Sequence, residues 1–467
     1  MNNDKKALKS GVWYLAANFL LKSIVFITTP IFSRLLTHED FGLYNNYTSW
    51  LSTLTVIVTL NLDSTFIRAR FEFEDKFDEF IFSVLTLSTL SGGIWLLLIN
   101  LFPKAAASIT GVDLYYLNLM IIYLIALPAV NMFQGRERYA YKYKASVAVS
   151  LIVSILTAVV SIVLVKSFQN RLAGRIIGSA APTILIGFGL YCFLWRKGKR
   201  VNLSYWKYAL PICLPFIPHL LSLSLLNSVD RIMITKICGP NDNALYSLAH
   251  TCGAIITLLV TSMNSAFSPW LGEKLNSDQI EDINRFSKKY ILGFTALSVG
   301  IILLTPEVLL IMGGKSYLAA LYVMPPVAFG CVCQFLYTMY VNIEQFKKKT
   351  VGMAFASASA ALLNFILNWI FIPRFGYIAA AYTTLVSFLW LLIVHILLVK
   401  RMGYLKVYPI RTVILALLFM SVYTLAVNAL YKLNYLRYAM ILAYCTILLV
   451  FILKNKSKIV SLLKRRS

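Results

Sequence analysis

Acidic residues are scarce in this sequence. Its 467 residues include 19 Asp and Glu against 44 Lys and Arg, and charged residues make up only 13% of the chain. Hydrophobic residues make up 59%, well above the roughly 45–50% that is typical of soluble domains. The excess cations lie between apolar runs, so the net charge of +25 indicates membrane topology and not nucleic-acid binding.

Several motifs of soluble enzymes are also missing. The sequence contains no Gly-x-x-x-x-Gly-Lys-Ser/Thr loop, which excludes ATP hydrolysis by a P-loop site. The seven cysteines lack ligand-like spacing apart from Cys331 and Cys333, whose thiols would point in different directions on a helix. We therefore expect packing cysteines, no metal site and no other cofactor. No small-residue cleavage site follows the first apolar stretch, so we expect an uncleaved first membrane helix.

The sequence instead has apolar runs of about 20 residues from end to end, each long enough to cross a roughly 30 Å hydrocarbon core. Because no water is available there, and because the runs are continuous and not alternating, we predict helices. The fold class is an all-α polytopic membrane protein with about 14 transmembrane helices. The predicted helices span residues 11–33, 40–63, 79–102, 114–134, 145–166, 174–195, 208–229, 244–268, 290–312, 320–343, 351–372, 377–399, 409–430 and 436–453.

The distribution of cations predicts how these helices are oriented. With the N-terminus in the cytoplasm, 32 of the 44 Lys and Arg residues fall on the cytoplasmic side and 11 on the outer side, with Lys22 in mid-membrane. This asymmetry follows the positive-inside rule and predicts a multi-pass protein of a bacterial cytoplasmic membrane, with both termini in the cytoplasm. The longest predicted cytoplasmic link runs from Pro269 to Lys289 and contains a short capped helix near Asn276.

Two short motifs recur at an offset of 202 residues. Phe41-Gly42-Leu43-Tyr44 corresponds to Asn243-Ala244-Leu245-Tyr246, and the stretch starting at Gly174 corresponds to the one starting at Gly376. We interpret this as a six-helix unit used twice, with the halves related by a pseudo-twofold axis along the membrane normal. The predicted parts are an N-terminal lobe (1–200), a C-terminal lobe (201–402), and helices 13 and 14 with a basic tail (403–467).

Polar side chains form stripes along several predicted helices. A lipid-facing surface cannot be this polar, so the stripes face a protein interior or a wet cavity. The alternative is that Ser, Thr and Asn hydrogen-bond neighbouring helices together. The predicted substrate-cavity residues are Lys22, Asn18, Asn45, Ser49, His250, Asn264, Gln334, Asn364 and Asn368.

Lys22 is the most informative of these residues. A mid-membrane ammonium costs about 2.5–3.5 kcal/mol on insertion scales, so it needs a cavity, an anionic ligand or a structural partner such as a helix-end carbonyl. We expect it to face the cavity.

Other charged residues lie near predicted helix ends. The expected outer-mouth or structural cations are Arg34, Arg175, Arg231 and Arg374. The acidic candidates for proton or sodium coupling are Asp63, Asp230 and Glu307. The predicted seventh helix holds Pro211, Pro215 and Pro218 and is the best hinge candidate, because proline kinks helices.

Three stretches resemble a known family. They are Pro30–Tyr44 (PIFSRLLTHEDFGLY), Asp230–Ile234 with Leu245–Ala249, and Gly314–Ala320. They are similar to motifs of Wzx-type polysaccharide-unit flippases in the multidrug/oligosaccharidyl-lipid/polysaccharide (MOP) exporter superfamily. The last two predicted helices depart from the twelve of many Wzx-type members and resemble those of lipid II flippases.

The resemblance implies a flippase that moves undecaprenyl-pyrophosphate-linked oligosaccharide from the inner to the outer leaflet by alternating access, for O-antigen, capsule or exopolysaccharide synthesis. The implied partners are that glycan, membrane lipids, and a polysaccharide polymerase with its chain-length machinery. It also implies that a basic cavity residue, best matched by Lys22, meets the pyrophosphate. The alternatives are a lipid II-type flippase, a multidrug cation antiporter and, with less support, a membrane glycosyltransferase or polymerase. The expected protein is therefore a transporter, not an enzyme.

Overall fold

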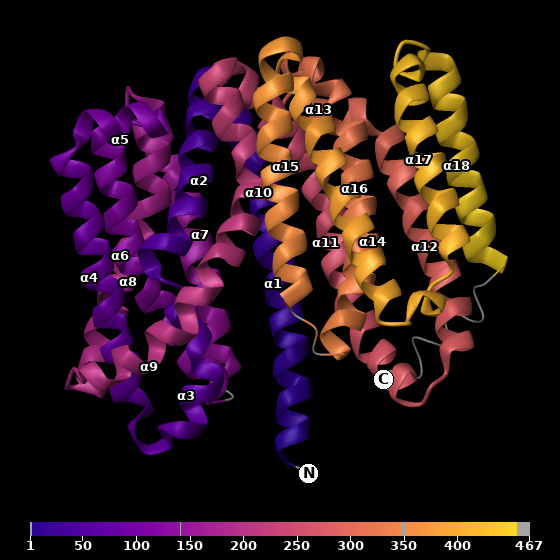
Figure 1. Cartoon of the computed structure of the whole chain (residues 1–467). Helices are drawn as coiled ribbons and strands as arrows, with labels where there is room; N and C mark the ends of the chain where they lie inside the picture. The colour runs from indigo at the N-terminus through magenta and orange to yellow at the C-terminus, as the bar shows by residue number, and fades with distance from the viewer. Residues whose placement is uncertain (1, 141, 348, 350, 455–467) are drawn as a thin grey trace.

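The computed structural model describes residues 2–140, 142–347, 349 and 351–454, and every regular element in these ranges is a helix (Figure 1). The predicted all-α fold class is confirmed. Backbone hydrogen bonds close within each helix, which is the requirement for crossing a membrane core.

The first half of the chain forms one bundle, seen in indigo and purple in Figure 1. In it α6 packs on α4 and α8, and α7 packs on α8 and α1. Its helices are α1 (Asn2–Leu35), α2 (His38–Thr59), α3 (Phe66–Glu72), α4 (Phe77–Leu101), α5 (Pro103–Thr110), α6 (Leu114–Tyr139), α7 (Tyr143–Ser167) and α8 (Arg171–Gly198), with short 3-10 turns η1 (Leu62–Thr65) and η2 (Glu74–Lys76).

The second bundle is drawn in magenta and orange (Figure 1), and in it α16 packs on α14 and α15. Its elements are α10 (Ile217–Ile237), α11 (Pro240–Asn276), α12 (Ile280–Leu303), α13 (Thr305–Met312), η4 (Lys315–Tyr322), α14 (Met324–Phe346), α15 (Val351–Phe375) and α16 (Tyr377–Arg401). They are preceded by α9 (Leu203–Cys213), which lies with the first bundle (Figure 1), and by η3 (Leu214–Phe216). The predicted seventh helix is broken at η3, which contains Pro215. Its first part, α9, packs against α4 of the first bundle, while α10 packs on α15.

The last elements, drawn in yellow, are η5 (Leu405–Val407), α17 (Ile410–Leu430) and α18 (Asn434–Lys454). Tyrosine hydroxyls fix them to α12. Tyr423, Tyr431 and Tyr444 donate hydrogen bonds of 3.2, 2.7 and 2.9 Å to backbone carbonyls of α12. These three hydrogen bonds attach the final pair of helices to the second bundle.

We call the end that holds the α1–α2, α10–α11 and α15–α16 connections the distal end, and the end near the N-terminus the proximal end (Figure 1). In the described residues, eleven helices are long and apolar enough to cross a membrane, or twelve if the bent pair of α2 with the helix starting at Leu62 is one span. α1 and α18 are not among them, so the predicted count of fourteen stays a prediction.

One predicted link is wrong. The stretch from Pro269 to Lys289 is almost wholly helical, because α11 continues through Pro269 to Asn276 and α12 begins at Ile280. Leu271 and Leu275 are buried there, so packing of the apolar face sustains the helix past the proline, which composition alone does not reveal. The predicted ninth helix also ends early, at Leu303, and α13 follows it as a separate helix.

Candidate functional site

The two bundles are joined at the distal end by a set of polar contacts that we call the distal seal. Ser33 donates to the Met312 carbonyl (2.5 Å), Arg34 donates to the Ile311 carbonyl (2.7 Å), and the His38 ring lies 3.1 Å from the Ser316 hydroxyl. These residues come from α1 and α2 on one side and from α13 and η4 on the other. The seal closes the distal end of the space between the bundles.

The tightest approach in the seal joins α2 to α11. A Cβ atom on Gly42 would lie 1.8 Å from the Pro240 carbonyl oxygen, so only glycine fits at this position. The Asn243 amide donates to the Gly42 carbonyl over 2.8 Å and is fully buried. The two copies of the repeated motif, one at Phe41 and the other at Asn243, therefore touch each other.

A cavity of about 320 Å³ lies just below this seal. Its walls come from α1, α2, α7 and α8 of the first bundle and from α11 of the second. Eight of its fourteen lining residues carry a polar side chain, although apolar atoms still form most of the lining surface. The polar residues in the lining are Thr28, Thr29, Asn45, Thr48, Ser154, Thr157, Arg175 and Thr251.

Arg175 is the cation of this cavity. Its guanidinium lies 3.6 Å from the Phe32 ring centroid and 4.2 Å from that of Tyr44, which are cation–π distances. Its Nε is buried and has no hydrogen-bond partner among the described residues. Two rings thus hold the planar group without satisfying all of its five donors.

A second arginine, half-buried, lies in the other bundle. The Arg231 guanidinium donates to the His250 Nδ1 over 2.8 Å, which requires the neutral ring to accept at that nitrogen. His250 directly precedes Thr251, one of the cavity residues. The Arg231 Nε is also buried and without a hydrogen-bond partner in the described part of the chain.

Asp230 lies at the centre of a buried polar network. Its carboxylate accepts hydrogen bonds from the Tyr246 hydroxyl (2.5 Å), the Thr384 hydroxyl (2.6 Å) and the Asn368 amide (2.6 Å). Asn364 extends the network by donating to Thr384 over 3.0 Å. Asn364 and Asn368 are fully buried, so the structure places these two predicted cavity residues inside the second bundle.

Lys22 is exposed on α1. It has no hydrogen-bond or ion-pair partner among the described residues, and it is not in the lining of the cavity. Thr29, seven positions later, does line the cavity, so Lys22 lies on the same helix face about 10 Å nearer the proximal end. The side chain of Asn18 lies outside the described residues.

The remaining predicted site residues are scattered. Asn45 lines the cavity, Ser49 is buried behind it, Asn264 accepts from Asn342 inside the second bundle (2.7 Å), and Gln334 is half-buried in α14. The other predicted residues lie at helix ends. Arg374 is exposed at the end of α15, Asp63 lies in η1, and Glu307 is paired with Arg437.

The sequence reasoning missed a buried, hydrogen-bonded His–Glu pair in the second bundle. The His395 Nδ1 lies 2.7 Å from the Glu344 Oε1, and both side chains are at most 3% exposed. The residues are 51 positions apart and share no motif, so no sequence signal joins them. The rings that hold Arg175 were missed for a similar reason, since Phe32 and Tyr44 come from different helices.

Comparisons with known proteins agree with this architecture. Residues 215–370 match the MatE family. The chain is 25% identical to "Lsg locus putative protein 1" of Haemophilus influenzae over 284 residues, covering 59% of this chain and 68% of that protein. It is 22% identical to an "Uncharacterized membrane protein" of the same organism over 367 residues, covering 76% and 88%.

The fold is that of MOP-superfamily transporters. A structure of the lipid II flippase MurJ in an inward closed conformation covers 95% of this chain and 99% of its own length, with a TM-score of 0.70 at 15% identity. An inward-facing multidrug MATE transporter of the MOP superfamily covers 83% and 95%, with a TM-score of 0.59 at 15% identity. Residues 7–275, more than half of the chain, match the family described as "Polysaccharide biosynthesis protein", and the chain belongs to that family.

Proposed function

We propose that this protein is a flippase that moves undecaprenyl-pyrophosphate-linked oligosaccharide repeat units from the inner to the outer leaflet of a bacterial cytoplasmic membrane. A pyrophosphate and its sugars cannot cross hydrocarbon without a hydrated, cationic path. The family match supports a role in making cell-surface polysaccharide. A polysaccharide polymerase and its chain-length machinery would take up the flipped unit.

The observation that carries the proposal is the Arg175 cavity. Its hydroxyl and amide lining suits sugar hydroxyls, which both donate and accept hydrogen bonds. Arg175 supplies a planar, always-charged group that matches phosphate oxygens. A cationic drug would meet this arginine unfavourably, and Asp230 is enclosed by its own hydrogen-bond donors, which disfavours the drug-antiporter alternative.

We propose that Lys22 and Arg175 act in sequence along one path. Lys22 is exposed about 10 Å proximal to the cavity on the same face of α1. With the positive-inside rule, the proximal end is cytoplasmic, so an entering pyrophosphate would meet Lys22 first and Arg175 second. The distal seal is closed in this arrangement, and rocking of the bundles would open it toward the outer leaflet.

We propose Asp230 as the ion-coupling carboxylate. It is surrounded by oxygen-bearing side chains from α11, α15 and α16, namely Tyr246, Asn364, Asn368 and Thr384. A carboxylate there can take up a proton, whereas a sodium ion would bind only after these donors turn their oxygens toward it. Because Asp230 of α10 is hydrogen-bonded to Asn368 of α15 and Thr384 of α16, ion uptake by Asp230 would change how α10 packs on these two helices.

The deciding experiment is a flipping assay in proteoliposomes. Labelled undecaprenyl-pyrophosphate-oligosaccharide is incorporated, and its accessibility on the opposite leaflet is followed for the parent protein and for Lys22→Ala, Arg175→Gln and Arg175→Lys. Hydrogen bonds to charged groups contribute roughly 1.5–3 kcal/mol, so we expect Arg175→Gln to slow flipping at least about tenfold. Arg196→Gln is the matched control, since Arg196 lies exposed on the same helix.

The outcomes separate the alternatives. Absence of flipping for every prenyl-linked sugar, together with efflux of a cationic dye, would place the protein with the drug antiporters. Flipping that survives Lys22→Ala and Arg175→Gln would refute the proposed path. For coupling, Asp230→Asn should abolish the dependence of flipping on an imposed sodium or proton gradient, and the gradient to which the parent responds identifies the ion.

A further inference from the structure

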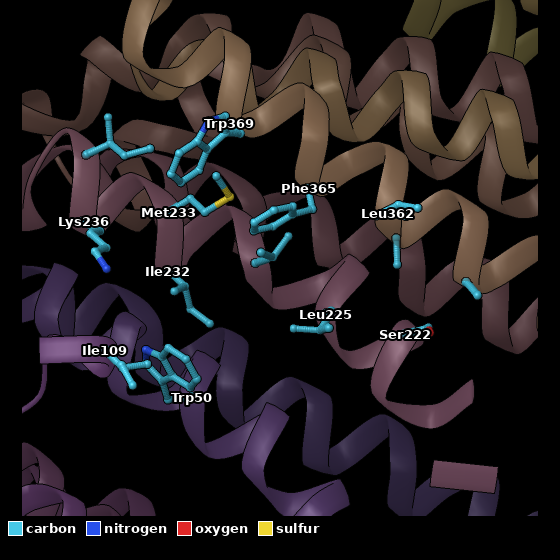
Figure 2. Close-up of a pocket in the computed structure, with 14 residues that line it drawn as sticks. Trp50, Ile109, Ser222, Leu225, Ile232, Met233, Lys236, Leu362, Phe365 and Trp369 are labelled. Carbon is cyan, nitrogen blue, oxygen red and sulfur yellow. The ribbon is translucent and has the colours of Figure 1, made fainter. Parts of the chain in front are cut away.

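A second hollow lies on the other side of α2, between the two bundles. It is bounded by α2 and α5 of the first bundle and by α10 and α15 of the second, and its volume is about 550 Å³. Figure 2 shows the side chains that line it. We call it the lateral groove. Its lining residues are Trp50, Ile109, Ser222, Leu225, Val229, Ile232, Met233, Lys236, Ile237, Ala358, Ala361, Leu362, Phe365 and Trp369.

The lining is almost entirely apolar, with Ser222 and Lys236 as its polar side chains outside the tryptophans. It runs along helices that cross the membrane, and Leu362 and Trp369 on its wall are 61% and 67% exposed. Water is poorly held in such a space because it finds too few polar partners. The occupant must therefore be apolar, and the surrounding lipid phase is its source.

The length of the groove limits which lipid chain fits. On α10 the lining extends from Ser222 to Ile237, which is about 22 Å of helix at roughly 1.5 Å per residue. Half of a roughly 30 Å hydrocarbon core is about 15 Å. The groove thus continues past the middle of the membrane, beyond the reach of a chain confined to one leaflet, and suits a long polyprenyl chain.

The distal end of the groove carries a cation. Lys236 lies in the last turn of α10, and Figure 2 shows it at one end of the groove with Ser222 at the other. Its side chain is exposed and has no hydrogen-bond or ion-pair partner within the described residues. An ammonium at the membrane interface attracts a phosphate, so the groove combines an apolar channel with an anion site at its distal mouth.

We propose that the lateral groove holds the polyprenyl chain of the carrier lipid on the distal, outer-leaflet side, with the phosphate of the carrier against Lys236. This rests on the proposed flippase function and names the place where the lipid part of the substrate leaves. The chain stays in an apolar environment between the bundles while the sugar-bearing head leaves the cavity. Opening of the distal seal would separate α2 from α10 and widen the groove.

Photo-crosslinking to a labelled polyprenyl phosphate tests the assignment. A benzophenone amino acid replaces Leu362 in the groove or, as a matched control, Leu418 on α17, which is 59% exposed. In nanodiscs of phosphatidylethanolamine and phosphatidylglycerol we expect stronger labelling at position 362. Lys236→Gln should reduce it about fivefold, Lys236→Arg should retain it, and Ala358→Phe, which fills the groove, should block it.

Ala426→Phe on the lipid-facing side of α17 is the size-matched control and should leave labelling unchanged. Equal labelling at positions 362 and 418 would overturn the assignment. It would also be overturned if added phosphatidylglycerol reduced labelling at position 362 as strongly as unlabelled polyprenyl phosphate does. Flipping that proceeds normally in Ala358→Phe and Lys236→Gln would refute the exit role and leave the flippase function standing. Specific labelling without any flipping of prenyl-linked sugars would refute the flippase function and leave a polyprenyl site.

Discussion

The approach of α2 to α11 at Gly42 predicts that one methyl group will open the distal seal. A Cβ at position 42 would lie 1.8 Å from the Pro240 carbonyl oxygen, whereas ordinary contact begins at 3.4 Å. In Gly42→Ala the two backbones must therefore separate by about 1.6 Å (3.4 − 1.8). The obstacle is backbone, which cannot rotate aside like a side chain.

The expected cost follows from this overlap. Overpacking of a tight contact costs about 1–3 kcal/mol, which corresponds to a factor of about 5–150 in an equilibrium. The penalty applies when the seal is closed and disappears when α2 and α11 part. Gly42→Ala should thus shift the population toward the distal-open arrangement by about that factor without unfolding either bundle.

Cross-linking across the seal measures the shift. His38 and Ser316 lie 3.1 Å apart, so the pair His38→Cys with Ser316→Cys should be joined readily by a short thiol reagent while the seal is closed. Adding Gly42→Ala should slow the joining. Gly93→Ala is the control, because no heavy atom lies within 4 Å of its added Cβ. An unchanged rate in Gly42→Ala would refute the reasoning.

Three further predictions concern buried ionisable side chains of the second bundle and of α18. Arg437→Gln removes two hydrogen bonds of 2.6 and 2.7 Å to Glu307. We expect the free energy of unfolding to fall by about 1.5–3 kcal/mol, which would be measured as a lower melting temperature in detergent. An unchanged melting temperature would show that α18 is held by its tyrosines. Burial is the largest single effect on the pKa of Glu307 and raises it. The hydrogen bonds and charge of Arg437, a backbone hydrogen bond and the Tyr438 hydroxyl together outweigh burial and hold that pKa below its ordinary value. This stabilisation should therefore be present above the unfolded-state pKa of about 4.3 and disappear as the pH falls through the lower folded-state value. The parent should then lose more stability than Glu307→Gln between pH 5 and pH 3 in melting scans, and parallel curves would contradict the assignment. His395→Phe leaves Glu344 buried without its partner, which should cost about 3–5 kcal/mol, whereas His395→Phe with Glu344→Leu should recover much of it; equal stability of the two variants in the same melts would refute the pairing.

Sequence patterns could predict the helical class, because it depends on local properties, whereas the six-helix repeat stays a prediction. Apolar runs determine where helices form, and the motif at Phe41 recurs at Asn243. Proline positions also indicated the break in the seventh predicted helix, where the structure has η3 around Pro215. The ends of the helices were harder to predict. For example, α11 continues through Pro269, because tertiary packing there outweighs the local effect of proline.

The composition of the cavity could not be predicted in the same way. A polar stripe shows which helix face avoids lipid, but not which neighbouring helix it meets. Asn364 and Asn368 have the spacing of a cavity stripe, yet they bind the Asp230 network. Arg175 has the sequence position of a helix-end cation, yet Phe32 and Tyr44 hold it in the cavity. Such placements depend on the rotation of each helix within the bundle.

The repeat also explains why the two buried networks lie where they do. Tyr44 and Tyr246 occupy the same position in the two motif copies, and each contacts a charged group of its own bundle, Arg175 in one case and Asp230 in the other. The copies meet at Gly42 and Asn243. Parting of the seal must therefore move both tyrosines. We infer that the cation site and the carboxylate site are linked mechanically through the seal, so that Gly42→Ala should alter flipping and its ion dependence together.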